Sequence, residues 1–72
     1  MEKGDRVKVV RISDYERMVC EAHGTRTSLG MVGVVWDVEY NPNMKSTEVT
    51  VQIAGDLYLF SSWQLALCKC QQ

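Results

Sequence analysis

The sequence predicts a mainly β domain, a small five-stranded barrel with one short helix in its first long connection. Gly30 and Gly33 stand at G-x-x-G spacing directly before a run of β-branched and aromatic residues. Glycines at the start of a strand allow the backbone to turn sharply, to bulge and to come close to a neighbouring strand. Two further segments, residues 6–12 and 47–54, alternate apolar with polar residues at the period of a strand.

The first predicted strand covers residues 6–12. Val7 and Val9 alternate there with Arg6 and Lys8, so one face of the strand is expected to be buried and the other charged.

A short helix is predicted to follow over residues 14–22. Ser13 and Glu16 form an S-x-x-E capping box, and Gly24 supplies a C-cap. The apolar residues between these caps recur at helical spacing and form one stripe: Tyr15, Met18, Val19 and Ala22. A helix this short is unstable alone, so we expect the stripe to lie across the barrel.

The second and third strands are predicted at residues 31–40 and 47–54. The turn cluster Asn41-Pro42-Asn43 separates them, because proline cannot donate to a strand ladder.

A tight hairpin is predicted at Gly55-Asp56, which stands between two strand-like segments. The fourth strand then covers residues 57–60. Residues 61–65 predict one turn of 3₁₀ helix, and residues 66–68 predict a short last strand.

Composition limits the chain to one domain, residues 1–72. The hydrophobic fraction of 46% with a single proline indicates a packed globule. No apolar stretch approaches the roughly 20 residues that span a bilayer, and three cysteines do not form the even-numbered framework of a secreted miniprotein. We therefore expect a small soluble protein in the cytoplasm.

The order of these elements resembles the SH3-like barrel: five short strands, a long first connection, a late tight hairpin and a single helical turn before the last strand. The opening Gly4-Asp5-x-Val7-x-Val9 and the G-x-x-G-x-V element at Gly30 are similar to KOW-type domains of ribosomal and transcription-elongation proteins. They are also similar to the small SH3-like barrels of photosynthetic electron-transfer complexes. The resemblance implies a non-enzymatic adaptor, a small subunit or regulator of a larger complex. Its alternative is an RNA- or DNA-associated module in transcription or translation.

Apolar residues on both faces of two predicted strands indicate a protein-binding surface. The segments Val34-Val35-Trp36 and Leu57-Tyr58-Leu59-Phe60 are apolar throughout, whereas a lone barrel buries one face of each strand. We expect the helix stripe to cover the second side; the alternative is that a partner protein docks on the part left exposed, since aromatic residues are frequent in binding hot spots, and both can hold for different residues. The predicted partner-binding residues are Tyr58, Phe60, Trp63, Trp36 and Tyr15.

Basic residues near the N-terminus give the alternative, a nucleic-acid surface. Residues 1–11 carry four basic and two acidic side chains, although the whole chain has a net charge of −1. Arg6, Lys8 and Arg11 would contact phosphates while nearby aromatic rings stack on bases. The simpler interpretation is a solvated strand face, because a net negative chain lacks the general attraction to nucleic acid.

Four residues are candidate metal ligands, because the topology could bring them together as a zinc ligand set: Cys20, His23, Cys68 and Cys70. Ordinary small thiols explain these cysteines as well, so we expect no metal and no cofactor. A catalytic Cys–His pair would need a third orienting group, and the sequence does not predict an enzyme.

Overall fold

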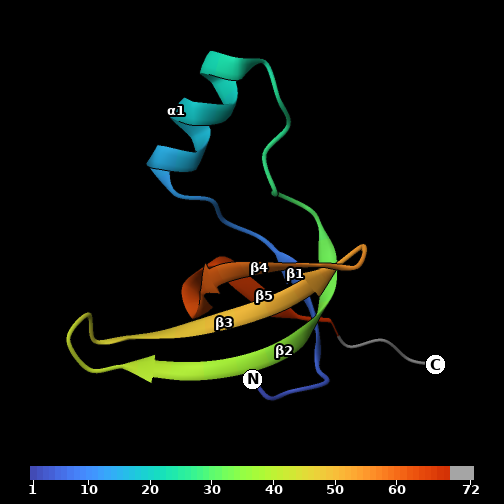
Figure 1. Ribbon diagram of the computed structural model, residues 1–72, viewed down its shortest axis with the longest axis vertical. Helices are drawn as coiled ribbons and strands as arrows, with labels where there is room; N and C mark the ends of the chain where they lie inside the picture. The colour runs from blue at the N-terminus through green and yellow to red at the C-terminus, as the bar shows by residue number, and fades with distance from the viewer. Residues whose placement is uncertain (69–72) are drawn as a thin grey trace.

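The computed structural model describes residues 1–68 (Figure 1). Along the chain the elements are β1 (Arg6–Val9), α1 (Asp14–His23), β2 (Val32–Asn41), β3 (Ser46–Ile53), β4 (Asp56–Ser61), the 3₁₀ helix η1 (Ser62–Gln64) and β5 (Leu65–Leu67). Each predicted element is present. The bounds agree with the prediction to within one residue, except that β1 ends at Val9 and not at Ile12.

The strands of residues 1–68 form one antiparallel sheet in the order β4-β3-β2-β1-β5. Within this part of the chain β4 pairs only with β3, and β5 pairs only with β1. The mainly β class with a helix in the first connection is confirmed. The sheet itself is open at β4 and β5, so closure into a barrel is not confirmed.

The core lies on the inner face of this coiled sheet. Its buried apolar side chains, among the residues described, are Val7, Val9, Val35, Val49, Val51, Phe60 and Leu65. The predicted alternation of β1 is confirmed, because Val7 and Val9 are buried while Arg6 and Lys8 are exposed.

A β-bulge in β2 turns two valines toward the same core. The register between β2 and β3 shifts between Val35 and Asp37, which leaves Trp36 without a direct partner. Without an extra residue, Val35 and Val38 would point to opposite faces. With it, Val35 is buried and Val38 packs against the core from the same side.

Gly33 lies where β2 leaves β3 and continues beside β1 alone. It is buried, and a Cβ built on it would lie 2.6 and 2.7 Å from side-chain carbons of Ile53 and Val51, and closer still to the Gln52 carbonyl oxygen. The predicted close approach is therefore correct for Gly33, whereas the positive φ of the G-x-x-G pair belongs to Gly30, at +90°.

The β3–β4 hairpin turns one residue earlier than predicted. Ile53 pairs with Asp56, so the two loop residues are Ala54 and Gly55. Both have positive φ, 54° and 88°, which is the requirement of a type I′ turn. Asp56 is the first residue of β4 and not part of the turn.

The helix α1 does not lie across the sheet, contrary to the prediction. It stands away from the strands in Figure 1 and contains no buried residue. Tyr15 is 76% exposed and Met18 is 65% exposed, so most of the apolar stripe remains uncovered. Neither α1 nor any other helix of the described chain is long and apolar enough to cross a membrane.

Candidate functional site

An open groove runs along the edge strand β4. Three successive residues of this strand, Tyr58, Leu59 and Phe60, line the groove, whose volume is about 360 Å³. Tyr58 and Phe60 pair in register with the buried Val51 and Val49, so both side chains point to the core side of the sheet, and the cavity lies beside β4. We refer to this cavity as the β4 groove.

The second wall of the β4 groove comes from the first connection. It consists of Glu16 of α1 together with Arg26, Ser28 and Met31 of the return segment, which we define as residues 25–31. The backbone N–H and the hydroxyl of Ser28 both donate to Oε2 of Glu16, each at 2.7 Å. Hydrogen bonds to an ionised group are the stronger kind, so this contact fixes the return segment to α1.

Local capping explains how Glu16 reaches this wall. The Ser13 hydroxyl accepts a hydrogen bond from the backbone N–H of Glu16 at 3.1 Å, as the predicted N-cap requires. The helix ends at Gly24, whose φ is +68°. The Glu16 carboxylate contacts Ser28 across the loop, and this contact could not be read from the capping pattern.

Arg26 is the basic residue among those that line the groove. It is exposed, and its guanidinium has no hydrogen-bond or ion-pair partner among residues 1–68. Its carbonyl oxygen accepts a hydrogen bond from Sγ of Cys20 at 3.5 Å, which holds the backbone of the return segment near α1.

Gln64 fixes the end of β4 to the end of β1, and the sequence analysis missed it. Its side chain accepts from the backbone N–H of Ser61 at 3.0 Å and donates to the Arg11 carbonyl at 3.4 Å. Its own carbonyl accepts from the backbone N–H of Val10 at 2.8 Å. The signal was available, because Ser61-x-x-Gln64 is a second capping-box pattern.

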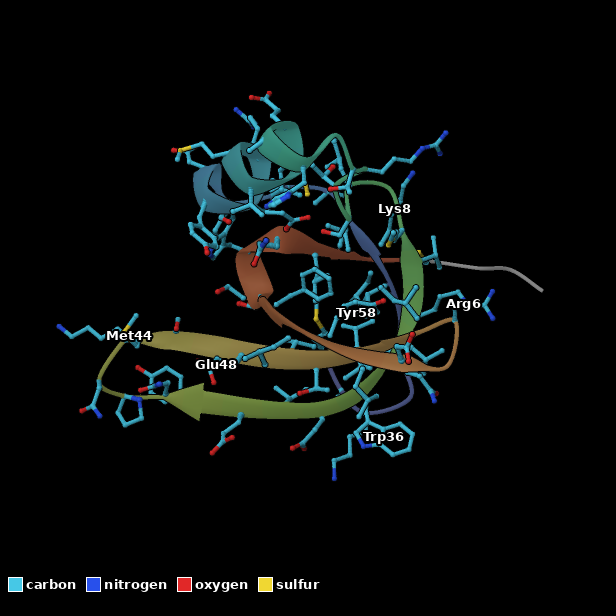
Figure 2. All side chains as sticks on the ribbon, turned by 45° about the horizontal axis from the view of Figure 1, so that its top comes forward. Arg6, Lys8, Trp36, Met44, Glu48 and Tyr58 are labelled. Carbon is cyan, nitrogen blue, oxygen red and sulfur yellow. The ribbon has the colours of Figure 1, made fainter. Side chains whose placement is uncertain are left out.

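Of the predicted partner-binding residues, the structure brings Tyr58 and Phe60 together at the β4 groove. Tyr58 is 44% exposed, whereas Phe60 is only 6% exposed and belongs mainly to the core. The other three do not line the groove. Tyr15 lies on the exposed side of α1, Trp63 on η1, and Trp36 projects from β2 away from Tyr58 (Figure 2).

The predicted basic residues divide between two environments. Arg6 and Lys8 point from the outer face of β1, and Arg6 is paired in register with Val34 two residues before Trp36. Arg11 instead donates from Nη1 to the Trp63 carbonyl at 3.2 Å. The outer face of β2 and β3 also carries acidic residues, because Glu39 lies directly opposite Glu48.

The candidate metal ligands within residues 1–68 lie in two separate parts of the chain. Cys20 and His23 belong to α1, and Cys68 follows β5. Within residues 1–68, no group of three or more His, Cys, Asp or Glu side chains is arranged to hold a metal ion. Cys70 lies outside the described residues.

Comparison of the chain with protein-family models, with curated proteins and with solved structures finds no match.

Proposed function

We propose that the chain is a non-enzymatic protein-binding module that docks another protein in the β4 groove. One observation carries this proposal: the groove combines exposed apolar side chains with the edge of β4, which has no pairing strand within residues 1–68. Tyr58, Leu59 and Met31 are all exposed and lie around one cavity. Exposed apolar surface of this kind, with an aromatic side chain near its centre, is typical of interaction sites.

The arrangement of elements supports an SH3-like architecture for this module. A long first connection containing α1 precedes β2, a tight hairpin joins β3 to β4, and η1 precedes β5. The first and last strands pair with each other, Val7 opposite Leu67 and Val9 opposite Leu65. In this proposal the β4 groove, beside the first connection, is the docking site of the small barrel.

Selection from a random peptide library tests the proposed function. Phage-displayed dodecapeptides are panned against the protein, and the selected peptides are measured by fluorescence anisotropy. We expect Tyr58→Ala to weaken binding by about 2 kcal/mol or more, the range of a hot spot. Trp36→Ala is the matched control, because it removes an exposed aromatic side chain from the other side of the sheet. Equal affinity of the Tyr58→Ala protein and the wild type would contradict docking at this groove.

A nucleic-acid function is the second candidate, favoured by one observation. Arg6 and Lys8 of β1 and Trp36 of β2 share the outer face of the sheet, and such a combination can contact phosphates and stack on a base. Under this function, binding of fluorescein-labelled oligouridine would weaken by at least about tenfold between roughly 50 and 200 mM salt. Lys8→Ala would reduce the affinity while Tyr58→Ala would leave it unchanged. Protein docking in the β4 groove predicts the reverse for the two variants and little dependence on salt.

A further inference from the structure

We propose that the β4 groove binds an extended peptide, which adds to the sheet as a new strand beside β4 and places an acidic side chain against Arg26. This inference rests on the proposed protein-binding function and specifies the conformation and chemistry of the partner segment.

The free edge of β4 is prepared for strand addition. No backbone group of Leu57, Tyr58, Leu59 or Phe60 hydrogen-bonds outside the β3 ladder within residues 1–68. Edge strands that stay unpaired are usually protected by lysine, proline or a bulge. β4 has the sequence DLYLFS, its register with β3 is regular, and its one charge lies at the first residue. An added strand would form hydrogen bonds with the backbone groups of β4 that point away from β3. Its side chains would cover those of β4 on both faces.

The second wall decides between a peptide and a second copy of this chain. The return segment and Glu16 stand opposite the edge of β4 and bound the groove on its other side. The contact between Glu16 and Ser28 joins the two parts of this wall to each other. Neighbouring strands of a sheet are about 4.8 Å apart, so a single extended chain needs little width. The β4 strand of a second copy carries its own β3 behind it, so a second copy needs room for at least two strands between β4 and this wall.

The lining predicts which side chains the peptide presents. Tyr58, Phe60 and Met31 are apolar and suit apolar side chains at alternate positions of the peptide. The two charged side chains of the wall, Glu16 and Arg26, differ in whether they already have a hydrogen-bond partner. Oε2 of Glu16 already accepts two hydrogen bonds from Ser28, whereas the Arg26 guanidinium has no partner in the described chain. The complementary charge on the peptide is therefore a carboxylate, which a guanidinium binds through two parallel hydrogen bonds.

An N-methyl scan of a selected peptide tests strand addition. The probe is the tightest dodecapeptide from the phage library, synthesised with one backbone nitrogen methylated at a time. Because alternate peptide N–H groups point toward β4, methylation should weaken binding at least tenfold at every second position and little between them. When the peptide binds, amide hydrogen exchange should slow at those residues of β4 whose N–H groups point away from β3. A flat methylation profile, or unchanged exchange in β4 with a bound peptide, would overturn the strand-addition model.

Replacement of Arg26 tests the predicted charge. Arg26→Ala should weaken the acidic peptide about tenfold, and should weaken a peptide with Asn or Gln in place of the acidic residue much less. Arg17→Ala is the matched control, because Arg17 is an exposed arginine of α1 that does not line the groove. Equal effects of Arg26→Ala on both peptides would refute the carboxylate contact.

The outcomes separate this inference from the proposed function. Peptides that bind with Tyr58-dependent affinity but without the alternating methylation pattern leave protein binding intact and exclude strand addition. Failure to select any peptide, together with a monomeric protein in sedimentation, contradicts both proposals. A concentration-dependent dimer that Leu59→Lys abolishes, while Thr50→Lys on β3 does not, would make a second copy the occupant and refute the peptide.

Discussion

At the scale of single residues, Ala54 and Gly33 carry different structural demands. Ala54 adopts a φ of 54° in the turn before β4, a conformation that costs an L-residue with a Cβ about 1 to 2 kcal/mol. Gly33 has the opposite demand, because its backbone is ordinary but the space around its Cα is filled by β3. A conformational cost thus arises in the β3–β4 turn and a packing cost in β2, and each can be measured by one substitution.

Ala54→Asn should stabilise the protein. Asn tolerates the left-handed region, and Asn-Gly is the preferred sequence of a type I′ hairpin. We expect a gain of about 1 kcal/mol, which corresponds to a rise in Tm of roughly 4 to 8 °C for a domain of this size. Thermal unfolding followed by circular dichroism measures it. An unchanged Tm would show that the turn does not strain Ala54.

Gly33→Ala should destabilise the protein strongly, because even a methyl group would contact the Gln52 carbonyl and the side chains of Val51 and Ile53. Overpacking of this kind costs about 1 to 3 kcal/mol or more. Urea denaturation gives the free energy of unfolding. Lys8→Ala, an exposed change on the adjacent strand β1, should alter it by less than about 0.5 kcal/mol, and similar values for both variants would contradict the close approach.

At the scale of elements, α1 differs from the sheet in what stabilises it. The strands share a buried core, whereas α1 buries no residue and is held by its caps and by the contact between Glu16 and Ser28. A ten-residue helix without burial is marginal in water. The helix should therefore open locally while the sheet remains folded.

Ser13→Ala should lower the stability of α1 by about 1 kcal/mol, the usual value of an N-cap. Because no core residue depends on α1, we expect faster amide exchange within residues 14–23 and nearly unchanged exchange in β2 and β3. Ser13→Thr keeps the cap and serves as the control. A parallel loss of protection in α1 and in the strands would show that the helix and the sheet unfold together.

At the scale of the whole molecule, the stability depends on a small core. Seven apolar side chains are buried among residues 1–68, and domains below about 70 to 80 residues rarely gain more than 3 to 5 kcal/mol from one core. Two aromatic residues three positions apart, Phe60 and Trp63, therefore have unequal weight. Phe60 is buried, while Trp63 is 52% exposed on η1.

Phe60→Ala should unfold the protein, because a buried Phe→Ala change costs about 3 to 5 kcal/mol. Trp63→Ala should leave a folded protein with a cooperative thermal transition, since half of the side chain is already in water. Near-ultraviolet circular dichroism and calorimetry distinguish the two results. A Trp63→Ala protein that fails to fold would mean that Trp63 supports the core through contacts that its exposure does not reveal.

Much of the fold could be predicted because it is encoded by local patterns. The Ser13 and Gly24 caps define α1, and the alternation of Val7 and Val9 defines β1. The bulge at Trp36 could not be predicted, since it depends on the register between two strands. The same limit explains the wrong position of α1. The apolar stripe of α1 indicated that the helix needs a partner surface. It did not show that the sheet fails to provide that surface.

The candidate site was predicted less well, because it is assembled from distant parts of the chain. Tyr58 was predicted from its aromatic side chain, yet Phe60 is mainly a core residue and Trp36 faces the opposite side. Arg26 and Ser28 belong to a polar loop whose sequence carries no binding signal. Only the contact between Ser28 and Glu16 shows that this loop forms a wall.

The base of the first connection is closed by a pair of backbone hydrogen bonds. Val9 N–H donates to the Met31 carbonyl at 2.9 Å, and Gly30 N–H donates to the Val9 carbonyl at 2.8 Å. Residues 13–29 thus leave the sheet and return to it at one point. Because doubling the length of a flexible loop adds only about 0.6 kcal/mol of closure cost, evolution can lengthen, shorten or replace this segment while the strands keep their sequence. The proposed binding specificity, which depends on the first connection, can therefore change separately from the stability of the sheet.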